Sequence, residues 1–303
     1  MKILLTTDGS PQAATALRTA SRLFRKEGQH AHVLCVAPKL DWSKQKHRPP
    51  TPKVAMMQEQ YQEQLKLEAR KVLVQAQSML AGEGVEALPL VEVGSPAKLI
   101  LQLAVNYDAI VVGAHDRYVR SQPGLGPVAS RIVAQAPHAV LVARETTAEH
   151  SLRVLVGVDG SPAAEQALRL LPEYFNTDAA EITLMQVVET PWIKFGLERD
   201  WFGGAPGADD PALRFNRELR LEAEDVIERA RQLLDDEGLS AQPMIEDGDP
   251  ALELLSEAER GGYDLIVLGA SGEDEVKHSL LGSVSTRVAQ DAPCSVFVAR
   301  FSE

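Results

Sequence analysis

The chain has 303 residues, of which 45% are hydrophobic and 24% are charged, and its formal net charge is -12. This length predicts two domains of about 150 residues, each able to bury an ordinary core. No apolar run reaches the roughly 18 residues of a membrane span, and the opening MKILLTTDGS turns too soon for a signal peptide. Cys35 and Cys294 stand in apolar segments of different halves, which excludes a disulfide framework. We therefore expect a cytoplasmic protein with reduced thiols.

The same order of segments occurs twice along the chain. The opening KILLTTDGS returns as RVLVGVDGS, VEVGSPA as IEDGDPA, YDAIVVGA as YDLIVLGA, and VLVAR as VFVAR. The offset between the copies grows slowly, from Asp8 and Asp159 to Gly113 and Gly269, so the copies differ by small insertions. We expect one domain at 1–145 and a second at 152–303.

Five apolar segments in each copy predict β-strands. They are short and rich in branched residues, and the fourth shows no alternation of apolar and polar positions. That lack of alternation is typical of a strand covered by helices on both faces. The expected strands are 2–7, 31–37, 86–91, 109–112 and 140–143 in the first copy, and 153–158, 181–188, 242–246, 265–268 and 295–299 in the second.

Helical segments alternate with these strands. Ser10 and Ser161 each precede a proline, and a serine cap followed by proline is typical of a helix start. We expect these helices to extend to about Glu27 and Phe175. A long helix in each copy carries one apolar stripe, which indicates a core face. The stripes are Leu65, Ala69, Val72, Leu73, Ala76, Met79 and Leu80, and Leu219, Ala223, Val226, Ile227, Ala230, Leu233 and Leu234. The alternation predicts an α/β fold with a doubly wound parallel sheet in each half.

Ligands of such sheets bind beyond the carboxyl ends of the strands. In the second copy Gly269-Ala-Ser-Gly272 is followed, after nine residues, by Gly282-Ser283. The glycines would let the backbone approach a ligand, and the helix that opens at Gly282-Ser283 would offer N–H groups to a phosphate. The hydroxyls of Ser283 and Ser285 are candidate donors to charged oxygens. The alternative is that the glycines only make a tight connection between strand and helix.

Together the two copies resemble a tandem universal stress protein. ATP-binding members of that family carry G-x2-G-x9-G-S/T after the fourth strand, an Asp after the first and a backbone contact after the second. The resemblance implies a five-stranded parallel sheet in each half, with a Rossmann-like, adenine nucleotide alpha hydrolase-like fold. It also implies one ATP per chain, with or without Mg²⁺, in the second half. The implied cofactor-binding residues are Val158, Asp159, Val187, Gly269, Gly272, Gly282, Ser283, Val284 and Ser285.

Both copies depart from the family motif. In the second copy Gly272 is followed by Glu273–Glu275, which would repel a triphosphate unless they point outward or hold a divalent metal, and Lys277 is the one cation of that loop. A less charged nucleotide therefore stays an alternative. In the first copy Asp116 replaces the second glycine, and at about 5 Å it would repel a phosphate charge by roughly 3 kcal/mol. Pro127 replaces the serine and removes a hydroxyl and an N–H group. We expect no ATP there, although Asp8 leaves room for a different ligand.

The leading hypothesis is a stress-response type of nucleotide-binding module. Its second half binds ATP, and the bound state regulates assembly or partner choice. By analogy with the family, we expect the halves to pack as a pseudo-dimer through their final strands, and whole chains to form a homodimer. The alternatives are a slow ATPase and an interaction protein without a nucleotide, whose basic insert at 39–53 would attract an anionic partner. We expect no catalytic residue, no metal site made by the protein, no membrane and no nucleic acid.

Overall fold

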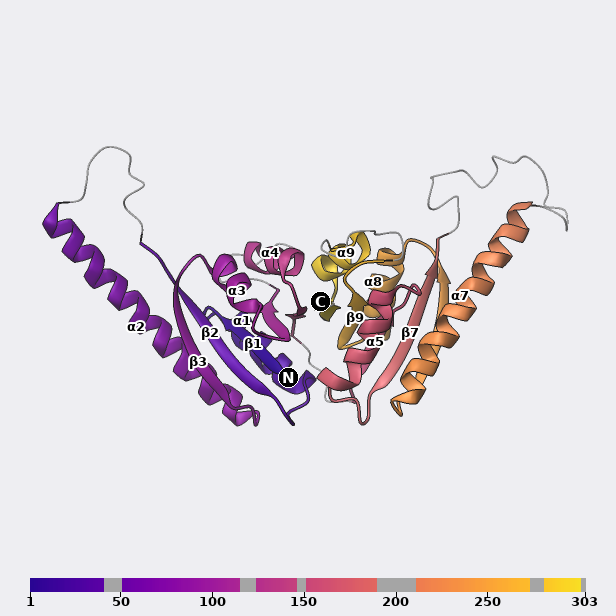
Figure 1. Cartoon of the computed structure of the whole chain (residues 1–303), viewed down its shortest axis with the longest axis horizontal. Helices are drawn as coiled ribbons and strands as arrows, with labels where there is room; N and C mark the ends of the chain where they lie inside the picture. The colour runs from indigo at the N-terminus through magenta and orange to yellow at the C-terminus, as the bar shows by residue number, and fades with distance from the viewer. Residues whose placement is uncertain (41–50, 115–123, 146–150, 190–210, 273–280, 301–303) are drawn as a thin grey trace. The chain divides into compact units, whose positions relative to one another are not determined.

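The computed structural model describes residues 1–40, 51–114, 124–145, 151–189, 211–272 and 281–300, with the backbone alone at 211–213. The chain divides into two compact units, Met1–Glu145 (unit 1) and Thr146–Glu303 (unit 2). In each unit strands and helices alternate along the chain, as the bounds below and Figure 1 show.

Unit 1 is a doubly wound α/β domain. Its strands are all parallel, in the order β3-β2-β1-β4-β5. Helices α1 and α2 pack on one face of the sheet, and α3 and α4 on the other. The strands are β1 (Lys2–Thr7), β2 (His30–Pro38), β3 (Ala87–Gly94), β4 (Ala109–Gly113) and β5 (Ala139–Ala143). The helices are α1 (Pro11–Leu23), α2 (Pro52–Gly82), α3 (Pro96–Ala104) and α4 (Pro127–Gln135).

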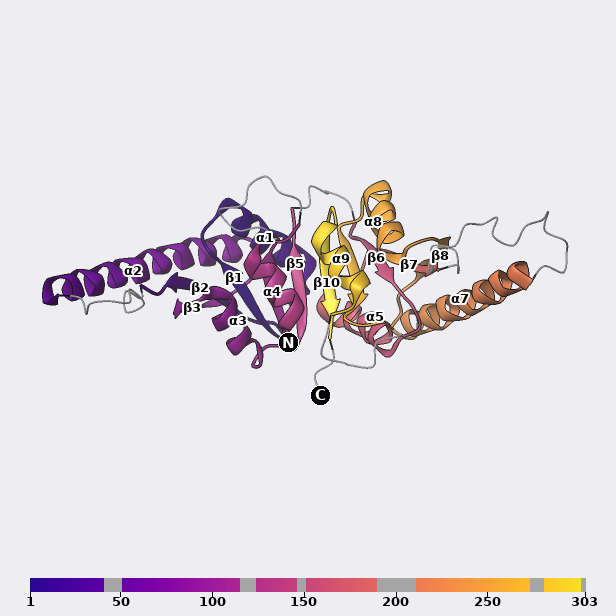
Figure 2. The ribbon, with the colours of Figure 1, turned by 90° about the horizontal axis from the view of Figure 1, so that it is seen from above.

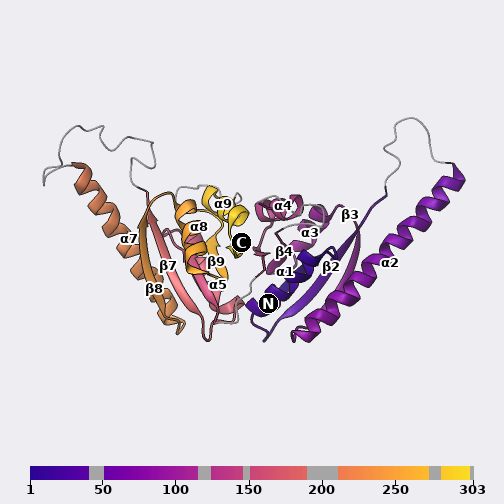
Figure 3. The same ribbon diagram turned by 180° about the vertical axis from the view of Figure 1, so that it is seen from behind.

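Unit 2 repeats this architecture with parallel strands in the order β10-β9-β6-β7-β8. Helices α5 and α7 cover one face, and α8 and α9 the other, as Figures 2 and 3 show from two sides. The strands are β6 (Arg153–Gly157), β7 (Glu181–Val188), β8 (Ala241–Asp247), β9 (Leu265–Gly269) and β10 (Ser295–Ala299). The helices are α5 (Pro162–Tyr174), α7 (Pro211–Asp236), α8 (Pro250–Gly261) and α9 (Ser283–Asp291).

Local sequence explains where the helices begin and end. The hydroxyl of Ser10 accepts a hydrogen bond of 3.1 Å from the N–H of Ala13, and Ser161 caps α5 in the same way. The predicted caps are therefore confirmed. The predicted end of α1 at Glu27 is wrong, because the helix ends at Leu23. Phe24 takes an extended conformation and buries its ring, which turns the chain away from the helix axis.

The two sheets form the cores of their units. Every residue of β5, β9 and β10 is buried, as is all of β4 except its terminal Gly113. Cys35 and Cys294 are buried and form no disulfide, as predicted. Among the residues that the structure describes, no helix has both the length and the apolar composition needed to cross a membrane. The expectation of an α/β fold with a doubly wound parallel sheet in each half is confirmed.

The long helices differ in part from the core stripe that we expected. In α2 the buried positions are Ala69, Leu73, Ala76 and Leu80, and α7 buries the equivalent four residues. Leu65 and Val72 are only half-buried and line a cavity instead. The stripe is therefore core toward the end of α2 and cavity wall toward its middle.

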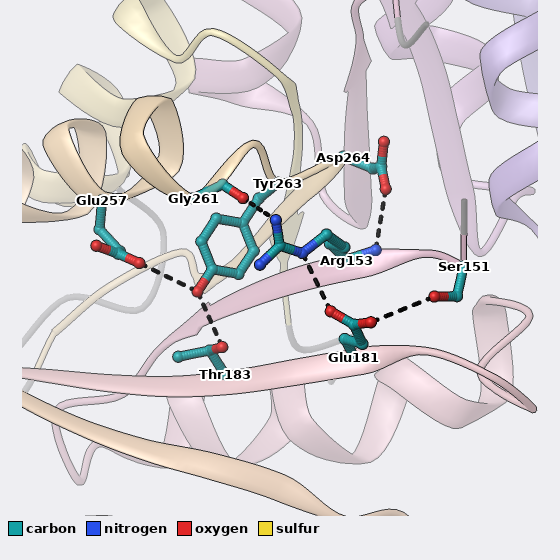
Figure 4. A network of polar contacts seen from close by, with 8 residues as sticks. All are labelled: Ser151, Arg153, Glu181, Thr183, Glu257, Gly261, Tyr263 and Asp264. Carbon is teal, nitrogen blue, oxygen red and sulfur yellow. Dashed lines mark hydrogen bonds and ion pairs between the residues drawn. The ribbon is translucent and has the colours of Figure 1, made fainter. Parts of the chain in front are cut away.

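A polar network holds the amino-terminal ends of β6, β7 and β9 together (Figure 4). Arg153 Nε lies 3.2 Å from Glu181 Oε2, and the backbone N–H of Arg153 donates to Asp264 Oδ2 at 2.9 Å. The same guanidinium donates to the carbonyl of Gly261 and lies 5.3 Å from the ring centroid of Tyr263. This network lies at the opposite end of the strands from the carboxyl ends where ligands of parallel sheets bind, so we assign it to stability.

Candidate functional site

A cavity of about 330 Å³ opens at the carboxyl ends of β6, β7 and β9 in unit 2. All the residues predicted to bind a cofactor line this cavity, although they come from four separate segments of the chain. They are Val158, Asp159, Val187, Gly269, Gly272, Gly282, Ser283, Val284 and Ser285. The doubly wound topology brings these segments together, since the carboxyl ends of parallel strands meet at one edge of the sheet.

Asp159 lies on the turn between β6 and α5. Its Oδ1 accepts a hydrogen bond of 3.0 Å from the N–H of Ser161, and its Oδ2 faces Gly272, where an added Cβ would lie 3.0 Å away. In unit 1, Asp8 makes the same turn bond to Ser10 at 2.9 Å. An aspartate at this position therefore has a structural role in both units, because its side chain stabilises the turn. In unit 2 its second oxygen also faces the loop after β9.

Gly269 and Gly272 have different reasons to be glycine. A Cβ on Gly269 would lie 2.6 Å from the carbonyl carbon of Ala163, so Gly269 is required by the close packing of β9 on the first turn of α5. The sequence predicted that Gly269 would let the backbone approach a ligand, which stays a prediction, and the structure adds a packing reason for this glycine. At Gly272, an added Cβ would point at the carboxylate of Asp159.

The first turn of α9 presents backbone donors to the cavity. The N–H of Gly282 donates to the carbonyl of Ala270 at 2.7 Å, and the first helical bond runs from Thr286 N–H to Gly282 at 2.9 Å. The N–H groups of Ser283, Val284 and Ser285 precede that bond, and the positive end of the helix dipole lies there. This arrangement suits an anion.

The two serines of this turn are not equivalent. Ser283 is exposed and its side chain is open to the cavity. Ser285 is buried, and its hydroxyl donates a hydrogen bond of 2.6 Å to the carbonyl oxygen of Gly269. The hydroxyl proton of Ser285 is therefore already used inside the protein, which leaves Ser283 as the side-chain donor for a ligand.

The end of β7 supplies the remaining wall of the cavity. Val187 is half-buried and lies opposite Glu246 of β8 in the strand register. Gln186 and Glu189 also line the cavity, and sequence reasoning missed both. The Oε1 atom of Gln186 is buried and has no hydrogen-bond partner among the residues that the structure describes. Alignment of the two copies could have pointed to Gln186, because this polar residue stands where the first copy has the apolar Cys35.

The charges of the described wall are Asp159 and Glu189, both carboxylates. Within the described wall, the groups best placed to attract an anion are the N–H groups at the start of α9 and the exposed Ser283 hydroxyl. Glu273–Glu275 and Lys277, which the sequence placed beside the phosphates, lie outside the described residues. Within the described ranges no group of three or more His, Cys, Asp or Glu side chains could hold a metal ion.

Unit 1 has a larger cavity, of about 840 Å³, at the equivalent ends of β1, β2 and β4. Gly126 N–H donates to the carbonyl of Ala114 at 2.8 Å, the counterpart of the bond from Gly282 to Ala270 in unit 2. The helix that follows opens with Pro127, and Ala129 stands where unit 2 has Ser285. Asp116, the expected source of repulsion, lies outside the described residues.

Comparisons with known proteins agree with this architecture. The model of the universal stress protein family matches residues 1–144 and again 151–300. A universal stress protein of Methanocaldococcus jannaschii, MJ0577, is 30% identical over 155 residues, covering 49% of this chain and 94% of its own. A universal stress protein of Mycolicibacterium smegmatis is 28% identical over 249 residues, covering 77% of this chain and 76% of its own.

A solved structure extends the likeness to the whole chain. The crystal structure of a universal stress protein from Archaeoglobus fulgidus covers 99% of this chain and 98% of its own, with a TM-score of 0.67. Its sequence identity is 21%, so this match supports the fold alone.

Proposed function

This chain belongs to the universal stress protein family, and from that premise we propose that unit 2 binds ATP in its cavity. The observation that carries the proposal is the convergence of Gly272, Gly282 and Ser283 on one cavity at the opening of α9. The phosphates would meet the N–H groups of that helix turn and the Ser283 hydroxyl. The adenosine would lie toward Asp159 and Val187.

The cavity suits this ligand in size and in donors. Its volume of about 330 Å³ lies at the lower end of the roughly 300–1,000 Å³ of small-molecule sites. The buried Oε1 of Gln186 offers an acceptor that a nucleobase amino group could satisfy. Mg²⁺, if it accompanies ATP, would reach the site with the phosphates, because the described wall offers no group of metal ligands.

We further propose that the bound nucleotide acts as a regulatory ligand. The titratable side chains of the described wall are the carboxylates of Asp159 and Glu189. The described wall has no lysine or arginine to stabilise a departing phosphate. The chain would therefore hold ATP with little turnover, and occupancy would change assembly or partner choice. The pseudo-dimer of the two units, the homodimer and a cytoplasmic location stay predictions.

The test of the regulatory proposal is sedimentation of the full chain with and without ATP, beside the Gly272→Asp variant. This variant places a carboxylate next to Asp159 and gives unit 2 the residue that the first copy has at this position in the sequence, Asp116. We expect ATP to change the sedimentation of the wild-type chain and not that of the variant. An identical response in both proteins would contradict the proposal.

A further inference from the structure

Of the cavities described above in the two units, the one in unit 1 is the larger, although the nucleotide motif of that unit is degraded. It measures about 840 Å³, against about 330 Å³ in unit 2. The proposed ATP site does not explain this volume. Its chemistry also differs from that of unit 2, because different side chains line it.

Helix α2 accounts for much of the difference between the two cavities. Tyr61, Leu65, Glu68, Ala69 and Val72 follow one another at the spacing of a single helical face, and all of them line the cavity. The equivalent face of α7 contributes no described residue to the cavity of unit 2. Unit 1 thus adds an aromatic ring and a carboxylate, two turns apart, to an apolar wall.

The described wall of this cavity carries carboxylates and no basic side chain. Both charged side chains of the described lining, Asp8 and Glu68, are carboxylates. Glu68 forms an exposed ion pair with Lys71 at 2.8 Å, so it lies at the solvent side of the wall. Gln12, on the first turn of α1, also lines the cavity, and its Oε1 is buried without a hydrogen-bond partner among the described residues. The second copy has Ala163 at the position of Gln12, so this acceptor belongs to unit 1 alone.

Two of the donors that suit an anion in unit 2 have no counterpart at the start of α4, the hydroxyl of Ser283 and its N–H group. Helix α4 opens with Pro127, which has no N–H group. Val128 and Ala129 line the cavity with apolar side chains. Among the described residues of the wall, an anionic ligand would therefore meet two carboxylates and no basic side chain.

We propose that the cavity of unit 1 binds an organic cation, a protonated amine carried on an aromatic or alicyclic body. The ammonium donates to the acceptors of the wall, Asp8 and Gln12, because charge-assisted hydrogen bonds are the strong ones. The ring of Tyr61 adds cation–π attraction. The body of the ligand packs on the apolar side chains of the wall, among them Leu65, Val72 and Ile100.

Three probes of one shape and different charge test this inference. They are 1-naphthylmethylammonium, the neutral 1-naphthalenemethanol and the anionic 1-naphthoate, titrated calorimetrically into the full chain with saturating ATP present. Saturating ATP fills the proposed site in unit 2, so that the probes report on unit 1. The same titrations without ATP show whether the two sites are independent. We expect the ammonium to bind about tenfold more tightly than the alcohol and the naphthoate to show no saturable binding.

Variants locate the probe in unit 1. Asp8→Asn keeps an oxygen for the turn bond to Ser10. It removes the negative charge and replaces the second oxygen by an NH2 group, so we expect the ammonium to lose about tenfold in affinity and the alcohol to lose much less. The matched change in unit 2, Asp159→Asn, leaves the ammonium unaffected. Val128→Trp should fill the cavity and abolish binding of both the ammonium and the alcohol. Its melting temperature is measured to show that the variant is folded. The inference is overturned if no probe binds, if naphthoate binds as tightly as the ammonium, or if Asp8→Asn and Asp159→Asn weaken the ammonium equally.

Discussion

The hydroxyl of Ser285 donates a hydrogen bond of 2.6 Å to the carbonyl oxygen of Gly269. This bond joins the first turn of α9 to the end of β9 inside the proposed site. In unit 1 the equivalent residues are Ala129 and Gly113, and that pair cannot form the bond because alanine has no hydroxyl. Ser285 therefore links α9 to β9, and we expect Ser283 to be the serine of this turn that donates to a ligand.

Ser285→Ala should lower the free energy of unfolding by about 1–2 kcal/mol, because it leaves a buried carbonyl without its donor. Ser283→Ala removes an exposed hydroxyl and should change the same free energy by less than about 0.5 kcal/mol. Urea denaturation of the two variants measures the difference. Equal losses would mean that the bond to Gly269 contributes nothing.

Ser283→Pro gives unit 2 the residue that unit 1 carries at this position, Pro127. Proline is tolerated at the first position of a helix, so folding should persist. The change removes a hydroxyl and an N–H group that we propose face a phosphate, and affinity for ATP should fall about a hundredfold. Calorimetric titration measures the affinity for ATP. We expect the affinity of Ser283→Ala to lie between those of the wild type and Ser283→Pro. Wild-type affinity in Ser283→Pro would show that the phosphates do not lie at α9.

Gly269→Ala should destabilise unit 2 by about 1–3 kcal/mol, since overpacking against backbone cannot be relieved by a side-chain rotation. The added Cβ would lie 2.6 Å from the carbonyl carbon of Ala163. Gly272→Ala is the matched control, because its Cβ meets only the carboxylate of Asp159, which can rotate away. Thermal or urea unfolding ranks the two variants. If Gly272→Ala were the more damaging, the packing role of Gly269 would be wrong.

Tyr263 predicts how stability depends on alkaline pH. Burial raises the pKa of this phenol above its ordinary value of 10.0, and its hydroxyl lies 2.9 Å from Thr183 Oγ1 and 3.2 Å from Glu257 Oε1. The unfolded chain therefore ionises first, so the contribution of Tyr263 is full below pH 10 and is lost as the pH rises through the folded pKa. Tyr107 in unit 1 is shifted the same way by burial.

The Tyr263→Phe variant isolates this contribution. It should be less stable than the wild type at neutral pH by about 1 kcal/mol, because a buried hydrogen bond is lost. Above pH 10 the two proteins should converge in stability. Urea denaturation at neutral and alkaline pH measures the gap, and a gap that widened with pH would contradict the assignment.

Much of the fold followed from the sequence because its signals are local. The serine–proline pairs at Ser10 and Ser161 place two helix starts, and unbroken apolar runs place the buried strands. The end of α1 was misplaced by four residues, because the burial of Phe24 depends on contacts that are distant in sequence.

The sequence predicted which residues would share the ligand site of unit 2, and their binding of a ligand stays a prediction. The structure shows that Gly272, Gly282 and Ser283 line one cavity. The packing role of Gly269 and the internal bond of Ser285 arise from residues far along the chain, so no local pattern carried them. The size of the cavity in unit 1 depends on how α2 lies on its sheet, which hydrophobic periodicity does not specify.

The central claim is that unit 2 holds ATP and that unit 1 does not. The most direct measurement is to denature the purified full chain and to identify and count the released nucleotide by chromatography and mass, beside the Gly272→Asp/Ser283→Pro variant. The account predicts about one ATP per wild-type chain and none in the variant, since that variant combines repulsion with lost donors. About two ATP per chain, or none together with no calorimetric binding of added ATP, would contradict it.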